Sequence, residues 1–115
     1  MLFSDLSRTK VFIKPGATDM RKSINGLSVI AQRTMKEDPY RNQLFVFCNR
    51  KRDRIKILYW DKNGFSLWLK WLNKHKYPWP KSDVPKQEID ISKLKLVLDG
   101  IDFFNAHETL AYRKV

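Results

Sequence analysis

Basic residues crowd the middle of this 115-residue chain, in a pattern that could hold the phosphates of a nucleic acid. Residues 50–81 carry ten Lys and Arg side chains against only Asp53 and Asp61, and the whole chain has a formal net charge of +11. Such an excess destabilises a compact fold by self-repulsion unless an anionic partner offsets it. Five of the cations fall within seven residues: Arg50, Lys51, Arg52, Arg54 and Lys56. Nucleic acid is therefore the first candidate partner.

Aromatic side chains follow this basic run. Trp60 comes soon after it, and Trp68 lies two residues before Lys70. Rings of this kind can stack on unpaired bases while cations such as Lys70 and Lys74 bind phosphates. The alternative is a solvated basic turn beside a core that buries the tryptophans, and for Trp60 and Trp71 we expect burial.

A second basic pair, Arg21 and Lys22, falls where we expect a long helix to begin. Thr18 or Asp19 can cap that helix, and its apolar positions recur at steps of three and four over residues 20–35. Cations in a first turn oppose the helix dipole, so acids are usual there. One interpretation is that the helix start and the two cations together hold a phosphate. The other is an exposed turn that tolerates a small cost.

Groups that could catalyse a reaction are sparse. Hydrolysis or strand transfer needs convergent carboxylates for metal ions, or a nucleophile with its base, and the spacing indicates neither. Cys48 is the single cysteine, so an intramolecular disulfide is excluded. His75 and His107 are too far apart to indicate a metal site. We expect no enzymatic activity, no metal and no cofactor.

A sheet and two helices are the elements expected to position these side chains. Apolar runs and alternation predict strands at residues 10–14, 44–48, 54–60 and 65–71. Turns at residues 49–53 and 61–64 join the last three strands into an antiparallel meander with a cationic tip. The sequence thus predicts an α+β fold: an antiparallel sheet, with this three-stranded meander at its centre, packed against the long N-terminal helix, which ends near Pro39. Ser92 caps a short C-terminal helix.

Alternation also predicts the two faces of the last two strands, provided that the turn between them has an even length. One face carries Arg54, Lys56, Leu58, Trp60, Phe65, Leu67, Leu69 and Trp71. The other face carries Ile55, Ile57, Tyr59, Ser66, Trp68 and Lys70.

The length is that of a single domain, which we place at residues 1–104, followed by a weakly ordered tail at residues 105–115. The longest apolar stretches are far shorter than the roughly 20 residues that span a bilayer, and no apolar leader is evident. We therefore expect a soluble, cytoplasmic protein.

Two blocks of the sequence, Thr18–Leu27 and Leu44–Phe65, resemble a known family. It is the accessory protein TnpB of the insertion sequence 66 family, which is distinct from the RNA-guided nuclease of the same name. Trp79-Pro80 and Leu98–Asp102 are similar to the closing signatures of the family, so the resemblance spans roughly residues 10–103. It implies a bacterial mobile-element protein encoded beside a separate transposase, which carries the catalytic acidic triad. It also implies a need for the protein in efficient transposition, with the transposase and another element-encoded accessory protein as partners. The family has no agreed catalytic residues.

These observations favour a non-catalytic accessory factor whose basic hairpin and helix start bind the phosphate backbone of element DNA. The predicted contact residues are Arg21, Lys22, Arg50, Lys51, Arg52, Arg54, Lys56, Trp68, Lys70 and Lys74. Two alternatives use other partners. The protein could be an adaptor that binds the transposase or another accessory subunit through aromatic side chains, or the same cations and rings could bind RNA.

Overall fold

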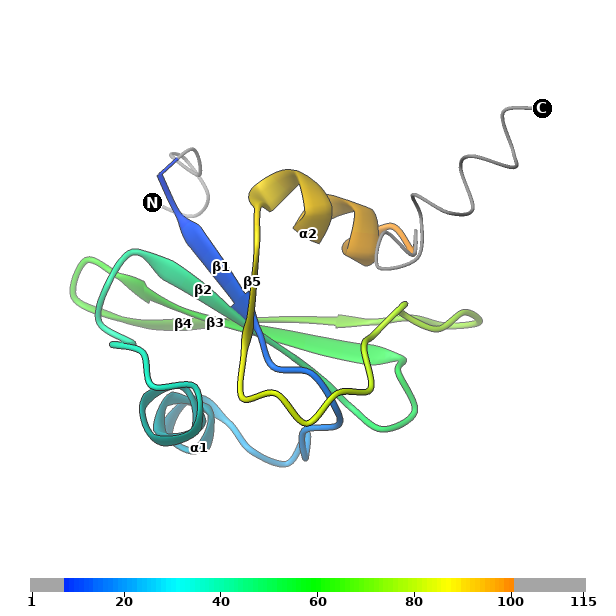
Figure 1. The fold of residues 1–115 in the computed structure, drawn as a ribbon, viewed down its shortest axis with the longest axis horizontal. Coiled ribbons are helices and arrows are strands. Elements are labelled where there is room, and N and C mark those ends of the chain that lie inside the picture. Colours follow the sequence, from blue (N-terminus) through cyan, green and yellow to red (C-terminus); the bar gives the residue numbers. More distant parts are fainter. Residues whose placement is uncertain (1–7, 101–115) are drawn as a thin grey trace.

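A five-stranded mixed sheet lies at the centre of the protein (Figure 1), whose computed structural model describes residues 8–100. The elements in chain order are β1 (Lys10–Ile13), α1 (Ile24–Val29), the π-helical segment η1 (Ile30–Thr34), β2 (Gln43–Cys48), β3 (Arg54–Asp61), β4 (Gly64–Trp71), β5 (Gln87–Ile89) and α2 (Ile91–Leu98). The strand order is β4-β3-β2-β1-β5. The predicted tail at residues 105–115, and the domain boundary before it, lie outside the described residues.

The prediction of an antiparallel sheet centred on a three-stranded meander is wrong. Strands β2, β3 and β4 pair antiparallel in chain order, but β1 adds to β2 in parallel and β5 adds to β1 antiparallel. A parallel pair needs a long crossover connection, which the segment containing α1 and η1 supplies. The outer side of β1 still carries backbone groups that need partners, and β5 provides them. The fold is mostly sheet, with two short helices.

The predicted long N-terminal helix is also wrong, because the residues before α1 form a turn instead. The Asp19 carboxylate accepts a hydrogen bond from the backbone N–H of Arg21 at 2.9 Å. The Lys56 ammonium donates to the carbonyl oxygens of Met20 and Lys22, both at 2.9 Å. In a helix that began earlier, those two carbonyls would instead accept hydrogen bonds from N–H groups of the next helical turn. Arg21 and Lys22 therefore precede α1 and do not lie in its first turn.

The same helix ends earlier than the sequence predicts. In η1 the backbone hydrogen bonds span five residues instead of four. The N–H of Met35 donates to the carbonyl of Ile30 at 2.9 Å, which is the spacing of a π-helix. Lys36 then adopts a left-handed conformation with φ of 58°, which stops the helix before Pro39.

Side chains on both faces of the sheet are buried, and Figure 1 shows α1 and α2 on opposite sides of it. Under α1 and η1 lies a cluster made of Leu27, Ala31 and Met35 with Phe12, Phe45, Phe47 and Leu58. Under α2 and the Tyr77–Trp79 segment lies a second cluster, which includes Ile13, Val46, Cys48, Ile57, Leu94 and Val97. Two covered faces explain why β2 is apolar at almost every position.

The register of the β3–β4 hairpin confirms the predicted faces. The turn has two residues, Lys62 and Asn63, because Asp61 pairs with Gly64. Arg54 therefore pairs with Trp71 at the far end of the hairpin. An even turn length keeps each predicted set of side chains on one face.

Candidate nucleic-acid interface

The turn between β2 and β3 is held by one asparagine side chain. The Asn49 Oδ1 atom accepts hydrogen bonds from the backbone N–H groups of Asp53 and Arg54, both at 3.0 Å, and its Nδ2 donates to the Asp53 carboxylate at 2.7 Å. Arg52 completes the turn with a positive φ of 60°. These bonds satisfy the backbone inside the turn. The turn therefore has a defined shape, from which its basic side chains extend.

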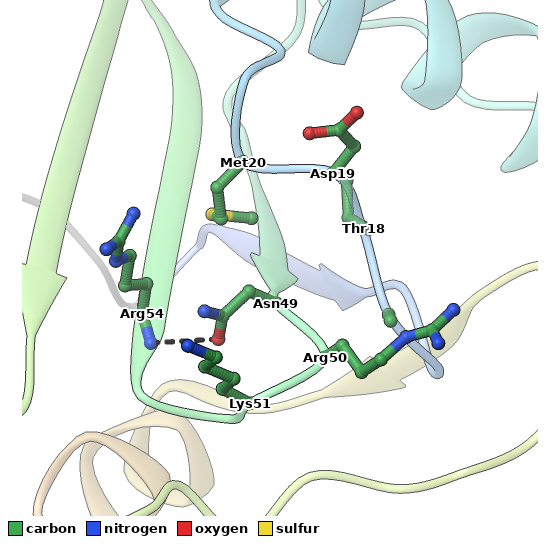
Figure 2. A pocket seen from close by; sticks show the side chains of 8 residues that line it. Thr18, Asp19, Met20, Asn49, Arg50, Lys51 and Arg54 are labelled. Carbon is green, nitrogen blue, oxygen red and sulfur yellow. Dashed lines mark hydrogen bonds between the residues drawn. The ribbon is translucent and has the colours of Figure 1, made fainter.

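A surface hollow of about 580 Å³ lies between this turn and the loop that joins β1 to α1. Figure 2 shows the loop residues on one side of it and the turn residues on the other. The backbone N–H of Thr18 donates to the carbonyl of Cys48 at 2.8 Å, which fixes the loop against the end of β2. The residues that line the hollow, which we call the basic hollow, are Ala17, Thr18, Asp19, Met20, Asn49, Arg50, Lys51 and Arg54.

Two polar atoms of this lining are buried without a hydrogen-bond partner. They are the hydroxyl oxygen of Thr18, whose residue is only 6% exposed, and the Nε of Arg54. A buried polar group without a partner costs about 1–3 kcal/mol, so such groups are rare in native proteins. Both atoms are covered by protein, so an oxyanion in the hollow would contact the exposed side chains of Arg50 and Lys51, and a guanidinium is the group best suited to a phosphate. The lining therefore has the chemistry of an anion site.

The one carboxylate of the lining is already paired. Asp19 accepts from the Arg21 guanidinium, with Nη2 to Oδ2 at 2.7 Å, and this hydrogen bond is the main cause that lowers the pKa of Asp19 to about 2. Among residues 8–100, no carboxylate forms an ion pair with Arg50, Lys51 or Arg54. Three cations therefore line the basic hollow without an ion pair, although the charge of Arg54 also acts on the nearby carboxylate of Asp53.

The remaining predicted contact residues divide into several groups. Arg21 is paired with Asp19, and Lys56 holds the turn before α1 through the carbonyl of Lys22. Both cations lie near the basic hollow, yet each already has a partner within the fold. The side chain of Lys22 itself is exposed.

The other four predicted contact residues lie apart from the basic hollow. Arg52 lines a neighbouring surface hollow on the other side of the turn, together with Trp79. Trp68 and Lys70 are on the opposite face of β4, where the Lys70 ammonium donates to the carbonyl of Leu98 at 3.3 Å. Lys74 is exposed in the segment after β4.

Sequence reasoning missed two residues of this region. Trp71 was expected in the core, but it is 62% exposed, and the Arg54 guanidinium carbon lies 3.7 Å from its ring centroid. The register was the available signal, because a cation and a ring at paired positions at the end of a hairpin can meet on one face. Thr18 gave no signal, since its burial depends on contacts between distant segments.

Cys48 has no features of a nucleophile. Its side chain is fully buried, and this burial raises the pKa of the thiol to about 12. Within residues 8–100, His, Cys, Asp and Glu side chains form no group of three or more that could hold a metal ion. Neither helix of this part of the chain has the length and apolarity needed to cross a membrane.

Fold and surface together define a small, basic, mostly-sheet protein with an open, cation-lined hollow. Residues 9–108 match the family described as IS66 Orf2 like protein, and the chain belongs to this family. The resemblance noted in the sequence is thereby confirmed. Membership indicates an accessory role in an insertion sequence and a general association with its transposition machinery.

Two relatives occur in Sinorhizobium fredii, and both are described as uncharacterized proteins. Protein y4hO is 32% identical over 106 residues, which is 92% of each chain. Protein y4jC is 28% identical over 94 residues, which is 82% of this chain and 80% of the relative. No solved structure matches the chain.

Proposed function

We propose that the protein is a non-catalytic accessory factor of insertion-sequence transposition that binds element DNA through the basic hollow. The observation that carries the proposal is that three basic residues of one turn, Arg50, Lys51 and Arg54, line the same hollow. An open hollow of this kind suits a phosphate that remains part of a polymer. Contacts to the phosphate backbone of DNA give affinity but do not distinguish one base sequence from another.

Electrostatic binding makes a quantitative prediction about salt. If the turn neutralises about four phosphates, the slope of log K against log salt on duplex DNA is about −0.9 for each phosphate, or about −4 in total. Fluorescence anisotropy of a labelled duplex over a range of salt concentrations measures this slope. A slope near zero would contradict phosphate binding.

Charge reversal locates the site. The double variant Arg50→Glu/Lys51→Glu changes two exposed side chains that have no partner role in the fold, so it should stay folded. For this variant the slope of log K against log salt should become less negative by about 2, because each lost phosphate contact changes the slope by about 1. The matched control is Lys10→Glu/Lys62→Glu, which makes the same change in net charge at exposed positions away from the basic hollow. Equal losses in the two variants would mean that only net charge matters.

The adaptor role is the second candidate, and one observation favours it. A hollow of about 270 Å³ with an almost entirely apolar lining lies between α2 and the sheet, and it is lined by Leu44, Ile57, Trp68, Ile91, Leu94, Lys95 and Leu98. An apolar hollow of this size can hold side chains of a protein partner. Adaptor function predicts that the transposase or the other element-encoded accessory protein co-purifies at high salt and after nuclease treatment. DNA-mediated association would be lost under both conditions.

A further inference from the structure

Trp71 is a large aromatic side chain that the fold leaves in solvent. It ends β4 on the face that α1 covers further along the sheet, and its neighbour on the same face, Leu69, is 52% exposed. A tryptophan offers 150–250 Å² of mostly apolar surface, so its exposure forgoes one of the larger stabilising contributions available to a core. An exposed ring beside a cationic surface indicates an anionic partner that can also pack against an aromatic side chain.

The ring of Trp71 is held in place from two directions. The Arg54 guanidinium stacks on it at 3.7 Å from the centroid. The pKa of Asp53 is lowered mainly by its hydrogen bond from Asn49 and, to a smaller extent, by the side chain of Trp71, which lies beside this carboxylate. The ring therefore has little freedom left to lose when a ligand binds.

The chain on both sides of Trp71 is also fixed. The N–H of the next residue, Leu72, donates to the carbonyl of Asp53 at 2.7 Å, and the N–H of Tyr77 donates to the carbonyl of Arg52 at 2.6 Å. These bonds tie the end of β4 and the following segment to the basic turn. The strand end cannot fray without breaking them, so the ring keeps its position relative to the cations of the turn.

Arg54 links the ring to the basic hollow, since it lines the hollow and stacks on Trp71. A phosphate in the hollow would place the adjoining nucleotide close to the exposed ring. Aromatic stacking on a base is worth about 1–3 kcal/mol and is tolerant of sequence. Bases inside a duplex are stacked on each other and cannot reach a protein ring, so only an unpaired base can use this surface.

We propose that Trp71, with Arg54 against its ring, is a stacking platform for an unpaired base of single-stranded DNA. This inference rests on the proposed binding of phosphates at the basic hollow. It adds a preference for unpaired over duplex DNA, and it assigns that preference to one side chain.

The test compares one labelled oligonucleotide, single-stranded and annealed to its complement, by fluorescence anisotropy at fixed salt. Trp71→Ala should weaken single-strand binding by about 5- to 150-fold, the equivalent of one lost base stack, and change duplex binding by less than about twofold. The control is Leu69→Ala, a comparably exposed apolar position on the same strand and face, which should change neither. Circular dichroism checks that each variant is folded.

A second variant keeps the inference testable if Trp71→Ala is poorly folded. Trp71→Phe retains a ring that can stack, so it should keep most of the single-strand affinity. Single-stranded DNA should quench the tryptophan fluorescence of the wild-type protein, and Trp71→Phe should lose this quenching because the other tryptophans are not at the platform.

The outcomes separate the two proposals. Unchanged single-strand binding in Trp71→Ala, with the salt slope intact, would overturn the stacking platform and leave the proposed function standing. Equal losses on single-stranded and duplex DNA would also overturn the platform. Absence of salt-dependent binding in the wild-type protein would overturn the proposed function itself. The same assay is run with an RNA oligonucleotide of the same sequence. If the protein bound this RNA more tightly than the single-stranded DNA, DNA would be overturned as the partner.

Discussion

Replacing Asn49 by alanine should unfold the basic turn locally and destabilise the whole protein. Alanine removes the acceptor of two backbone N–H groups, those of Asp53 and Arg54. Each such bond contributes about 1 kcal/mol, so the free energy of unfolding should fall by about 2 kcal/mol. In a chain of this size the change corresponds to a melting temperature lower by about 10 °C.

Urea unfolding followed by circular dichroism measures the change in stability of Asn49→Ala, and anisotropy measures its effect on DNA binding. The loosened turn should weaken binding although the variant keeps every cation. Asn63→Ala is the matched control, because Asn63 lies exposed in the other hairpin turn and its side chain makes no hydrogen bond to the described residues. Its stability should stay within about 0.5 kcal/mol of the wild type. If both variants behaved alike, the side chain of Asn49 would not be what shapes the turn.

Three further predictions concern single groups. The Asp19 pKa is lowered to about 2 mainly by its hydrogen bond with Arg21, so its stabilising contribution is present above 3.8 and is lost as the pH falls toward 2. Arg21→Ala should raise this pKa toward 3.8 in an NMR titration, although the backbone N–H of residue 21 still donates to the carboxylate and keeps the pKa below 3.8; a value still near 2 would refute the pairing. Cys48 should resist thiol reagents in the folded protein at mildly alkaline pH and react after unfolding, because its buried thiol has a pKa raised to about 12. Trp79→Phe should cost about 3 kcal/mol in urea unfolding, since the buried indole N–H donates to two backbone carbonyls that Phe cannot serve.

The hairpin that carries the basic turn could be predicted from the sequence because its signals are local. A run of apolar residues, a polar turn with Asn49 and Asp53 at its ends, and an alternating return strand specify β2 and β3 without reference to other segments. The even length of the next turn then assigns the faces of β4.

The start of the helix could not be predicted, because a distant side chain decides it. The apolar spacing over residues 20–35 is helical, but the ammonium of Lys56 takes the carbonyls of Met20 and Lys22. This contact joins segments more than 30 residues apart in the sequence. Local propensity gave no warning that a strand side chain would compete for those carbonyls.

The site shows the same division between local and distant signals. Arg50 and Lys51 could be assigned to the surface from their position in a turn. The burial of Thr18 depends on the contact of its loop with the end of β2, and the exposure of Trp71 depends on how far α1 reaches across the sheet; only the three-dimensional fold determines both.

Strand β1 has consequences for how the protein is made. It is the first of the described strands to leave the ribosome, yet one of its neighbours, β5, is the last, and the indole of Trp79, which donates to the carbonyl of Lys14 just after β1, also follows late in the chain. Pairings between such distant segments are slow to form. A nascent chain carrying β1 through β4 would therefore present an open strand edge, and the sheet closes only once translation has passed Ile89.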